Sequence, residues 1–453
     1  MISLFNVAIR STLRAVLRTV YVRCAPVRLA CVAGFATLRA ACGRLSTLRS
    51  DSHGRSPFRR WLQLVFFFHG LYTRDLNPIR TAPMLGTHKA RQGSACSHPL
   101  RSTFGKEDML DRRTAIEGCL LGCAVGDSIC LPYEGIAPQR VGRMLKLPLR
   151  HRFFFGCGMV SDDTDHSVFV GQCLARNPTD PDQFARSLAW RLRFWLLCLP
   201  AGIGMATLKS ILRLWCGVQF SRSGVFSAGN GAAMRSAIIG VVHSEDSDLR
   251  HRFTQASSAL THSDPKAEFG ARAIADLAAC VSRDGTRPPI SKLEEILWDA
   301  GEGDEWRDTI RRAVAACRSG EIRDAVTSAG LKRGVSGYIL HTLPVAVASW
   351  YIHFGDFRKT IEAVAMLGGD TDTVAAIAGS LAGISCARDG IPNDWVTGII
   401  DRPHGVAYIS ELAETLASGQ TGNTGFSWLL FPRGILFTVS VLCHGFRRLL
   451  PPY

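Results

Sequence analysis

The sequence predicts an all-α fold, and three observations support this. Apolar residues recur at i, i+3 and i+4 through most of residues 114–403. Helix formers such as Ala and Leu dominate the same stretch, and long alternating runs of β-branched residues are absent from it. The hydrophobic fraction of 47% is typical of a globular protein. We therefore expect a helical domain with a substantial buried core, flanked by irregular terminal extensions.

Eight segments carry the helical pattern, and each is expected to form a helix. The last of them begins directly after Thr373, where an Ala-rich run follows a double glycine that permits unusual backbone angles. No short-period repeat of the solenoid kind is present. In chain order the expected helices are Ala115–Val125, Ser167–Ala175, Pro181–Leu197, Met205–Leu214, Ala267–Val281, Asp308–Ala316, Leu343–Phe354 and Val374–Ile384.

The 453 residues are best divided into one large domain, residues 111–420, with extensions at 1–110 and 421–453. The first extension is rich in Arg and has no acid before Asp51, a composition typical of a transit peptide. A start codon assigned too far upstream would give a similar composition, and a disordered segment is a further alternative. We expect a cytoplasmic protein, with an organelle-targeting N-terminus as the alternative.

Two apolar runs in the extensions are poor candidates for membrane helices. Trp61–Phe68 is far shorter than the roughly 20 residues that span a bilayer. Phe426–Phe446 is interrupted by Pro432 and Arg433 and is followed by two further arginines. We expect the C-terminal segment either to dock on the domain or to be disordered, and we expect no membrane partner.

Charge and cysteine content exclude other classes of function. The net charge of +15 comes largely from arginines in the first hundred residues, and no helix-turn-helix, zinc-finger or RNA-recognition motif is present. No nucleic-acid partner is therefore expected. The 15 cysteines are scattered singly, which favours a reducing compartment. Cys119, Cys123 and Cys130 lie among small apolar residues and are expected to be small buried hydrophobes.

Two aspartate-rich motifs indicate a metal site. They are VSDDTDH, which begins at Val160, and GGDTDT, which begins at Gly368. Crowded carboxylates repel one another, and a divalent cation neutralises them most directly. Oxygen donors without nearby His or Cys favour Mg²⁺, or else Mn²⁺, over zinc. The alternative is that Thr371 or Asp372 merely caps a helix, but one cap does not explain two acidic clusters.

Five ordered segments together resemble the ADP-ribosylglycohydrolase family, which includes dinitrogenase reductase-activating glycohydrolases and ADP-ribosyl-acceptor hydrolases. The resemblance covers about residues 111–404, and IPNDW at Ile391–Trp395 follows the last segment. The segments are GCLLGCAVGDSICLPYEG (118–135), VSDDTDHS (160–167), SAGNGAAMRSAIIG (227–240), THSDPKAEFGA (261–271) and GGDTDTVAAIAGSLAGI (368–384).

The resemblance implies a compact orthogonal helical bundle that holds two Mg²⁺ ions in a central cleft. Ser161 falls where the family has a metal-binding Thr and keeps a hydroxyl. Glu134 matches an acid on a mobile loop near the metals, although a solvated loop glutamate remains the alternative. The implied metal ligands are Ser161, Asp162, Asp163, Asp370, Asp372 and Thr373, and the implied catalytic residues are Glu134, Asp163 and Asp372.

The resemblance also implies a loop that binds diphosphate and ribose. Its small residues would let backbone N–H groups approach phosphate oxygens. His262 matches a family histidine near the substrate, and Asp127 is interpreted as a cap or support of the first motif without an assigned role. The implied substrate-binding residues are Ser227, Gly229, Asn230, Gly231 and His262.

The function implied is metal-dependent hydrolysis of the glycosidic bond between ADP-ribose and a modified protein side chain. The alternatives are hydrolysis of small ADP-ribose conjugates and a non-catalytic ADP-ribose-binding or crystallin-like relative. Retention of all the acidic positions argues against the non-catalytic alternative. The acceptor linkage, whether arginine, serine or another, and the oligomeric state are left open.

Overall fold

The computed structural model describes residues 111–153, 155–419 and 424–448. Every regular element within these ranges is a helix, which confirms the predicted all-α class. Strand-like pairing in the same ranges is limited to isolated bridges between loops. The N-terminal segment expected to be targeting-like or disordered, and the apolar run Trp61–Phe68, lie outside the described residues.

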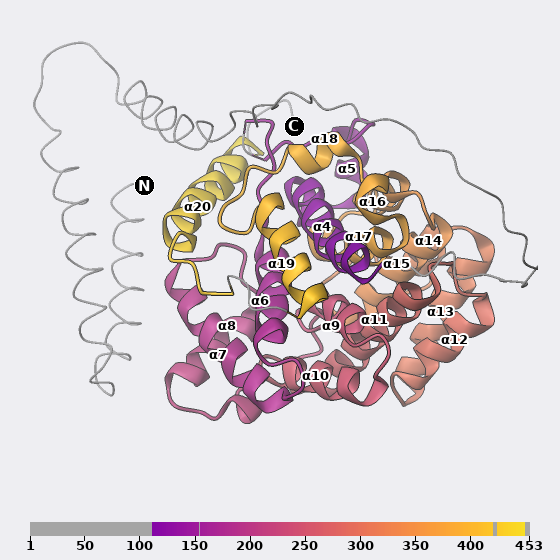
Figure 1. Ribbon diagram of the computed structural model, residues 1–453. Coiled ribbons are helices and arrows are strands. Elements are labelled where there is room, and N and C mark those ends of the chain that lie inside the picture. The colour runs from indigo at the N-terminus through magenta and orange to yellow at the C-terminus, as the bar shows by residue number, and fades with distance from the viewer. Residues whose placement is uncertain (1–110, 154, 420–423, 449–453) are drawn as a thin grey trace, which may run out of the picture. The chain divides into compact units, whose positions relative to one another are not determined.

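The helices are labelled as in Figure 1, where the first described one is α4. Three short 3₁₀ helices, η2 (Leu131–Tyr133), η3 (Phe220–Arg222) and η4 (Ala233–Arg235), lie between them. The α-helices are α4 (Arg112–Cys130), α5 (Pro138–Met144), α6 (Asp162–Arg176), α7 (Pro181–Leu197), α8 (Met205–Trp215), α9 (Ala237–Val242), α10 (Ser247–Ala259), α11 (Pro265–Asp284), α12 (Ile290–Asp299), α13 (Asp304–Ser319), α14 (Ile322–Thr327), α15 (Ile339–Ile352), α16 (Phe357–Ala365), α17 (Thr371–Gly390), α18 (Asn393–Thr397), α19 (Val406–Ser418) and α20 (Leu430–Arg447).

All eight expected helices are present, and the expected Pro181–Leu197 agrees with α7 at both ends. Helix α15, which was expected at Leu343–Phe354, differs from the expected bounds at both ends. It begins four residues earlier and ends at Ile352, because the chain turns at His353 toward Gly355, whose φ is +83°. The sequence pattern did not indicate the remaining helices, most of which are short.

Helices α4 and α17 pack antiparallel at the centre of the domain (Figure 1). Their contact is made by small residues, since a Cβ added to Gly122 would lie 2.0 Å from the carbonyl oxygen of Gly379. Gly118 and Gly126 make the same kind of approach to Gly383 and Ala375. The two backbones can approach this closely only because glycine has no side chain. This contact brings the C-terminal end of α4 beside the N-terminal end of α17.

Replacing Gly122 with alanine is expected to destabilise the domain by at least about 2 kcal/mol, because the new methyl group would force apart two buried backbones. Gly142→Ala in α5 is the matched control, since nothing lies within 4 Å of a Cβ at that position. The control should be neutral or slightly stabilising, by up to about 1 kcal/mol, because alanine is the better helix former. Urea unfolding of both variants measures the difference. Equal stabilities would contradict the proposed tight contact.

Helix α4 is also a core helix in composition and burial. The segment Arg112–Tyr133 is long and apolar enough to cross a membrane, but 94% of its apolar window is buried inside the protein. Cys119, Cys123 and Cys130 on this helix are buried and form no disulfide, as expected of small buried hydrophobes. Burial raises the pKa of Cys123 to about 12, so this thiol stays protonated at neutral pH.

The C-terminal segment docks on the domain, which was one of its two expected alternatives. Phe437 of α20 packs with Leu131, Phe153 and Met159, and its ring centroid lies 5.4 Å from that of Phe153. A Cβ added to Gly434 would lie 1.9 Å from the carbonyl oxygen of Cys198, so α20 approaches the end of α7 closely. Residues 430–447 are therefore an integral part of the folded unit.

Candidate active site

The first aspartate motif forms the N-terminal end of α6. Ser161 caps this helix, because its hydroxyl accepts a hydrogen bond of 3.3 Å from the backbone N–H of Asp163. The same hydroxyl donates to Asp163 Oδ2 at 3.1 Å. Asp127 Oδ2 supports the turn by accepting bonds from Ser161 N, at 2.8 Å, and from the Thr164 hydroxyl, at 2.6 Å. Asp127 therefore supports the first motif, as the sequence indicated.

The second aspartate motif forms the N-terminal end of α17, but its acids do not act as caps. Asp370 occupies the N-cap position and makes no capping hydrogen bond with its side chain. Its Oδ2 accepts instead from the amide of Asn230, at 2.7 Å. The Thr371 hydroxyl donates to the carbonyl oxygen of Cys130, and the carboxylate of Asp372 is buried. Helix capping therefore does not explain why acids occupy these positions.

Side-chain contacts join the two motifs, which are about 200 residues apart in the sequence. The hydroxyl of Thr373 donates to Asp163 Oδ2 at 3.3 Å, so the two helix ends meet directly. The N-terminal ends of α6 and α17 both carry partial positive charge, which favours carboxylates and bound anions. The described structure thus brings together every acid of the predicted metal set.

The carboxylates of this cluster disfavour one another's charged forms. Burial, followed by the nearby charges of Asp162 and Asp127, raises the pKa of Asp163 well above its usual range. Burial, Glu134 and Asp370 raise the pKa of Asp372 in the same way. Burial also raises the pKa of Asp127, to about 7. Such a cluster would gain stability from a bound cation, which favours the ionised form of every carboxylate.

The donor chemistry of the cluster fits a hard divalent cation. Three carboxylate oxygens, Asp127 Oδ1, Asp163 Oδ1 and Asp372 Oδ1, are buried and have no hydrogen-bond partner among the described residues. Unpaired buried polar atoms are rare and call for a ligand. In the described part of the chain, however, no three His, Cys, Asp or Glu side chains are already arranged around one point as metal ligands. Metal binding would therefore require side-chain rotation within the cluster.

A cavity of about 360 Å³ lies over the cluster. Asp162 lines this cavity, whereas Asp163 is only 1% exposed and lies behind the hydroxyls that bond to it. Except for Asp163, every site residue expected from the sequence lines the cavity, namely Glu134, Ser161, Asp162, Ser227, Gly229, Asn230, Gly231, His262, Asp370, Asp372 and Thr373.

The loop of residues 227–231 is packed against His262, which explains its glycines in part. A Cβ added to Gly229 would lie 2.9 Å from His262 Nε2, and one added to Gly231 would lie 3.1 Å from the same ring. The His262 ring shares a 2.8 Å hydrogen bond with the hydroxyl of Thr261 through Nδ1. Burial lowers the pKa of His262 to about 3, so the ring is neutral at physiological pH.

Arg235 donates hydrogen bonds to this loop and its neighbours, and it was not identified as a site residue from the sequence. Its guanidinium is fully buried and donates to the carbonyl oxygen of Gly231 and to the hydroxyl of Thr261, the latter at 2.8 Å. It also donates to the backbone and the hydroxyl of Ser257 on α10. The position of Arg235 within the SAGNG segment was the available signal, because a charged residue in an otherwise small and apolar run needs partners.

Backbone bridges connect the loops around the cavity. Next to Glu134, Gly135 N donates to the carbonyl oxygen of Gly369 at 2.8 Å, and Gly369 N donates to the carbonyl oxygen of Ile136 at 2.9 Å. Gly369 has a φ of +84°, which lets the same turn also bridge to Val335. Asn230 N donates to the carbonyl oxygen of Gly337 at 2.9 Å. Backbone hydrogen bonds therefore connect the segments that carry the acidic residues with the loop of residues 227–231.

Glu134 lies at the exposed mouth of the cavity. Glu134 is exposed to solvent, but its carboxylate lies beside the carboxylates of Asp370 and Asp372. Loss of solvation at this mouth, followed by the charge of Asp370, raises the pKa of Glu134. Glu134 therefore lines the cavity while remaining exposed, and the solvated loop glutamate stays the alternative interpretation.

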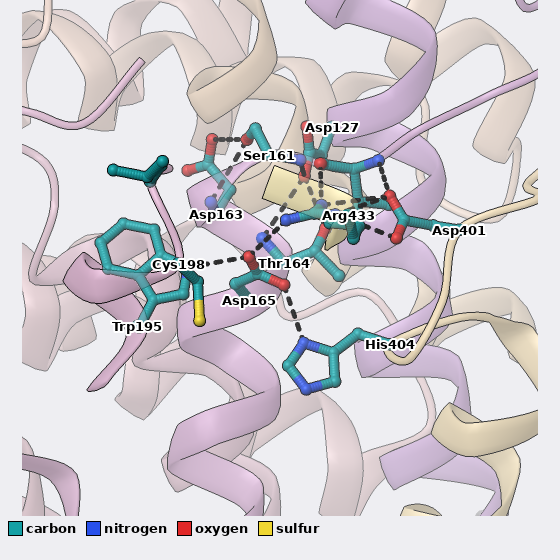
Figure 2. A network of polar contacts seen from close by, with 12 residues as sticks. Asp127, Ser161, Asp163, Thr164, Asp165, Trp195, Cys198, Asp401, His404 and Arg433 are labelled. Carbon is teal, nitrogen blue, oxygen red and sulfur yellow. Dashed lines mark hydrogen bonds and ion pairs between the residues drawn. The ribbon is translucent and has the colours of Figure 1, made fainter. Parts of the chain in front are cut away.

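A buried arginine from α20 supports the first motif from behind (Figure 2). Arg433 Nη1 donates to Asp165 Oδ2 at 2.7 Å, and its Nε and Nη2 bond to the carboxylate of Asp401. Asp165 also accepts from Trp195 Nε1, at 2.9 Å, and its other oxygen lies 2.7 Å from His404 Nδ1. Against the effect of burial, Arg433 and His404 hold the pKa of Asp165 well below its usual range.

This network was missed from the sequence. Arg433 was noted only as an interruption of an apolar run, and Asp165 was treated as part of the SDDTD cluster. In the structure Asp165 points away from the cavity, toward Arg433 and His404, and has a structural role (Figure 2). The available signal was an arginine near the start of an acid-free, apolar helix.

Comparison with known proteins identifies a family and several similar chains. The sequence model described as ADP-ribosylglycohydrolase matches residues 108–424. A protein from Archaeoglobus fulgidus is 31% identical over 308 residues, covering 66% of this chain and 94% of that protein. The ADP-ribosyl-[dinitrogen reductase] glycohydrolase of Rhodospirillum rubrum is 26% identical over 292 residues, with coverages of 62% and 88%. A solved ADP-ribosylglycohydrolase-related protein complex shares the fold, with a TM-score of 0.51, 22% identity and coverages of 69% and 99%.

Proposed function

The chain belongs to the ADP-ribosylglycohydrolase family, and from this premise we propose that it is a divalent-cation-dependent hydrolase that releases ADP-ribose from a modified protein side chain. Family membership supports the coarser part of this statement, that the protein is a glycohydrolase acting on bonds between ADP-ribose and an acceptor. Metal dependence and the protein-linked substrate are the proposed parts.

The observation that carries the proposal is the meeting of two acidic helix ends at one cavity. Asp162 on α6 and Asp370 and Asp372 on α17 line the same space as Glu134. Carboxylate oxygens in this cluster are buried without partners, and burial together with mutual repulsion raises the pKa of Asp372. A folded protein that keeps such an unfavourable cluster at a cavity is expected to use it.

The proposed ligands are Ser161, Asp162, Asp163, Asp370, Asp372 and Thr373, for two Mg²⁺ ions or for Mn²⁺. Divalent cations at such a site supply binding of sugar hydroxyls and a lower pKa for water. Asn230 orients the carboxylate of Asp370 through its 2.7 Å hydrogen bond. The hydroxyls of Ser161 and Thr373 orient Asp163 in the same way. These contacts hold Asp370 and Asp163 within the cluster, where side-chain rotation would complete the proposed ligand set.

The remaining cavity residues have complementary roles in this proposal. The loop of residues 227–231 presents small residues and backbone N–H groups, which suit a diphosphate and ribose. Neutral His262 can accept or donate one hydrogen bond beside that loop without adding charge. Glu134, whose pKa is raised at the mouth of the cavity, can exchange a proton with water or with the leaving group. Cleavage at the anomeric carbon requires such proton transfer.

Release of free ADP-ribose tests the proposal. The full chain is incubated with arginine-linked and with serine-linked ADP-ribosylated proteins, in Mg²⁺ and then in EDTA. We expect release in Mg²⁺ from one linkage and loss of release in EDTA, because the carboxylates would lose the cation that organises them. Release that is unchanged in EDTA would contradict metal dependence.

Two further outcomes would replace the proposed substrate or activity. Release only from small ADP-ribose conjugates, with modified proteins untouched, would favour the small-conjugate hydrolase. Binding of ADP-ribose without release from any substrate would favour a non-catalytic binding protein. The linkage that is cleaved would identify the acceptor residue. The cavity residues by themselves favour neither arginine nor serine as that acceptor.

A further inference from the structure

Helix α20 contributes to the cavity although it lies outside the residues that the family model matches, which end at 424. Phe437 and Val441 of this helix line the cavity together with Leu131 and Glu134. The helix is anchored near its start by buried Arg433 and along its length by Phe437. It ends beside the loop that carries Glu134 (residues 131–137, the Glu134 loop).

The Glu134 loop is held by contacts with two separate segments of the chain. In the first, Gly135 and Ile136 bridge to Gly369 in the second aspartate motif. In the second, Arg448 directly after α20 donates through Nη1 to the carbonyl oxygen of Glu134 at 3.0 Å. Arg448 Nη2 donates to the carbonyl oxygen of Pro132, and His444 Nε2 lies 3.2 Å from the same oxygen.

Arg448 is itself held in place. Its backbone carbonyl accepts a 2.7 Å hydrogen bond from Arg140 Nη2 on α5, the helix that follows the Glu134 loop. The guanidinium contacts carbonyl groups two residues apart, as a planar fork of donors can. Without these bonds the carbonyl oxygens of Pro132 and Glu134 would lose their contacts with Arg448, and the exposed part of the loop around Glu134 would open more often.

We propose that Arg448 is a positioning residue: from the end of α20 it clamps the Glu134 loop against the second aspartate motif and so keeps Glu134 facing the acidic cluster. The clamp adds a positioning residue to the proposed hydrolase, and it rests on that proposed function for the role of Glu134. Arg448 donates hydrogen bonds to backbone carbonyl groups of the loop and does not line the cavity, so it acts through the loop and not on substrate. The rate benefit expected of such a clamp is preorganisation of the proton-transfer group.

The test combines loop exchange with kinetics in the full chain. In Arg448→Ala we expect backbone amides of residues 134–136 to exchange hydrogen about tenfold faster, because the loop opens more often. We expect kcat to fall roughly 10- to 100-fold with KM within about twofold, because Glu134 is misplaced while the substrate loop is untouched. Arg448→Lys should recover part of both effects, since an ammonium can still bond to one carbonyl oxygen.

Val439→Ala is the matched control. Val439 lies on the outer side of α20 and is 38% exposed, so its removal should change neither loop exchange nor kcat. Unchanged exchange of residues 134–136 in Arg448→Ala would overturn the clamp, as would equal effects of Arg448→Ala and Val439→Ala. If Arg448→Ala does not fold, the test rests on Arg448→Lys. Wild-type amide exchange and wild-type kcat in Arg448→Lys would then overturn the proposal. Absence of hydrolysis in the wild type would refute the proposed function alone, because amide exchange still reports on the clamp.

Discussion

Replacing Asp370 or Asp372 with alanine is expected to abolish ADP-ribose release while leaving the helices intact. Both residues lie at the start of α17 and line the cavity, and neither caps the helix. Loss of partners around metal ligands alone typically lowers activity roughly 10- to 100-fold. Loss of a proposed ligand should therefore lower it by at least about 1000-fold. Release of ADP-ribose in Mg²⁺, with circular dichroism for the fold, measures both parts.

Stability measurements separate a metal role from a structural one. Asp372 is buried among other carboxylates, and one of its oxygens has no partner in the described structure. Its removal should therefore not destabilise the protein in EDTA. Mg²⁺ at 100 times its dissociation constant should stabilise the wild type by about 2.7 kcal/mol and the variant by much less.

Asp389→Ala is the matched control for these variants, because Asp389 is exposed near the other end of the same helix. It should keep full activity and the full response to Mg²⁺. Full activity in Asp370→Ala would sink the assignment of the second motif as a metal site. A large loss of stability in EDTA would instead indicate that the acid serves the fold.

The sequence was most informative where several functional residues lie close together in one short segment. The SDDT, SAGNG and DTDT segments each hold several site residues within a few positions, and helical patterning placed the DTDT segment at the start of a helix. The cavity then collects these segments, because the small-residue contact between Gly122 and Gly379 aligns α4 with α17. Local motifs therefore predicted most residues that line the cavity, whereas the helix contact that brings them together comes from the structure.

Partners that come from distant positions could not be predicted in this way. Arg433 and Arg448 are more than 260 residues from the atoms they bond in the first motif and in the Glu134 loop. Neither has a motif of its own, and the apolar run around Arg433 suggested only a docked or disordered tail. Their roles depend on where α20 packs, which is a property of tertiary structure. Arg235 was missed for the same reason, since its partners lie on α10 and beside His262.

Replacing Arg433 with alanine is expected to be the most destabilising single change in the chain. Its side chain is 4% exposed and bonds to Asp165, to Asp401 and to the carbonyl oxygen of Val160. The variant leaves two buried carboxylates without their cation, which typically costs about 3–5 kcal/mol. A typical domain has about 5–15 kcal/mol of stability in total, so urea unfolding should show the loss of a large part of it.

The surface pair of Arg358 and Asp394 provides the control for Arg433. Its nitrogen–oxygen distance of 3.2 Å is similar, but the side chains are 34% and 62% exposed. Arg358→Ala should therefore cost no more than about 1 kcal/mol. Equal losses in the two variants would contradict a buried anchor. The double variant Arg433→Met and Asp401→Asn should recover part of the loss, because it removes one uncompensated buried charge and keeps the apolar contact with Phe437. Recovery in that variant would show that α20 is held to the first motif by charge pairing as well as by packing.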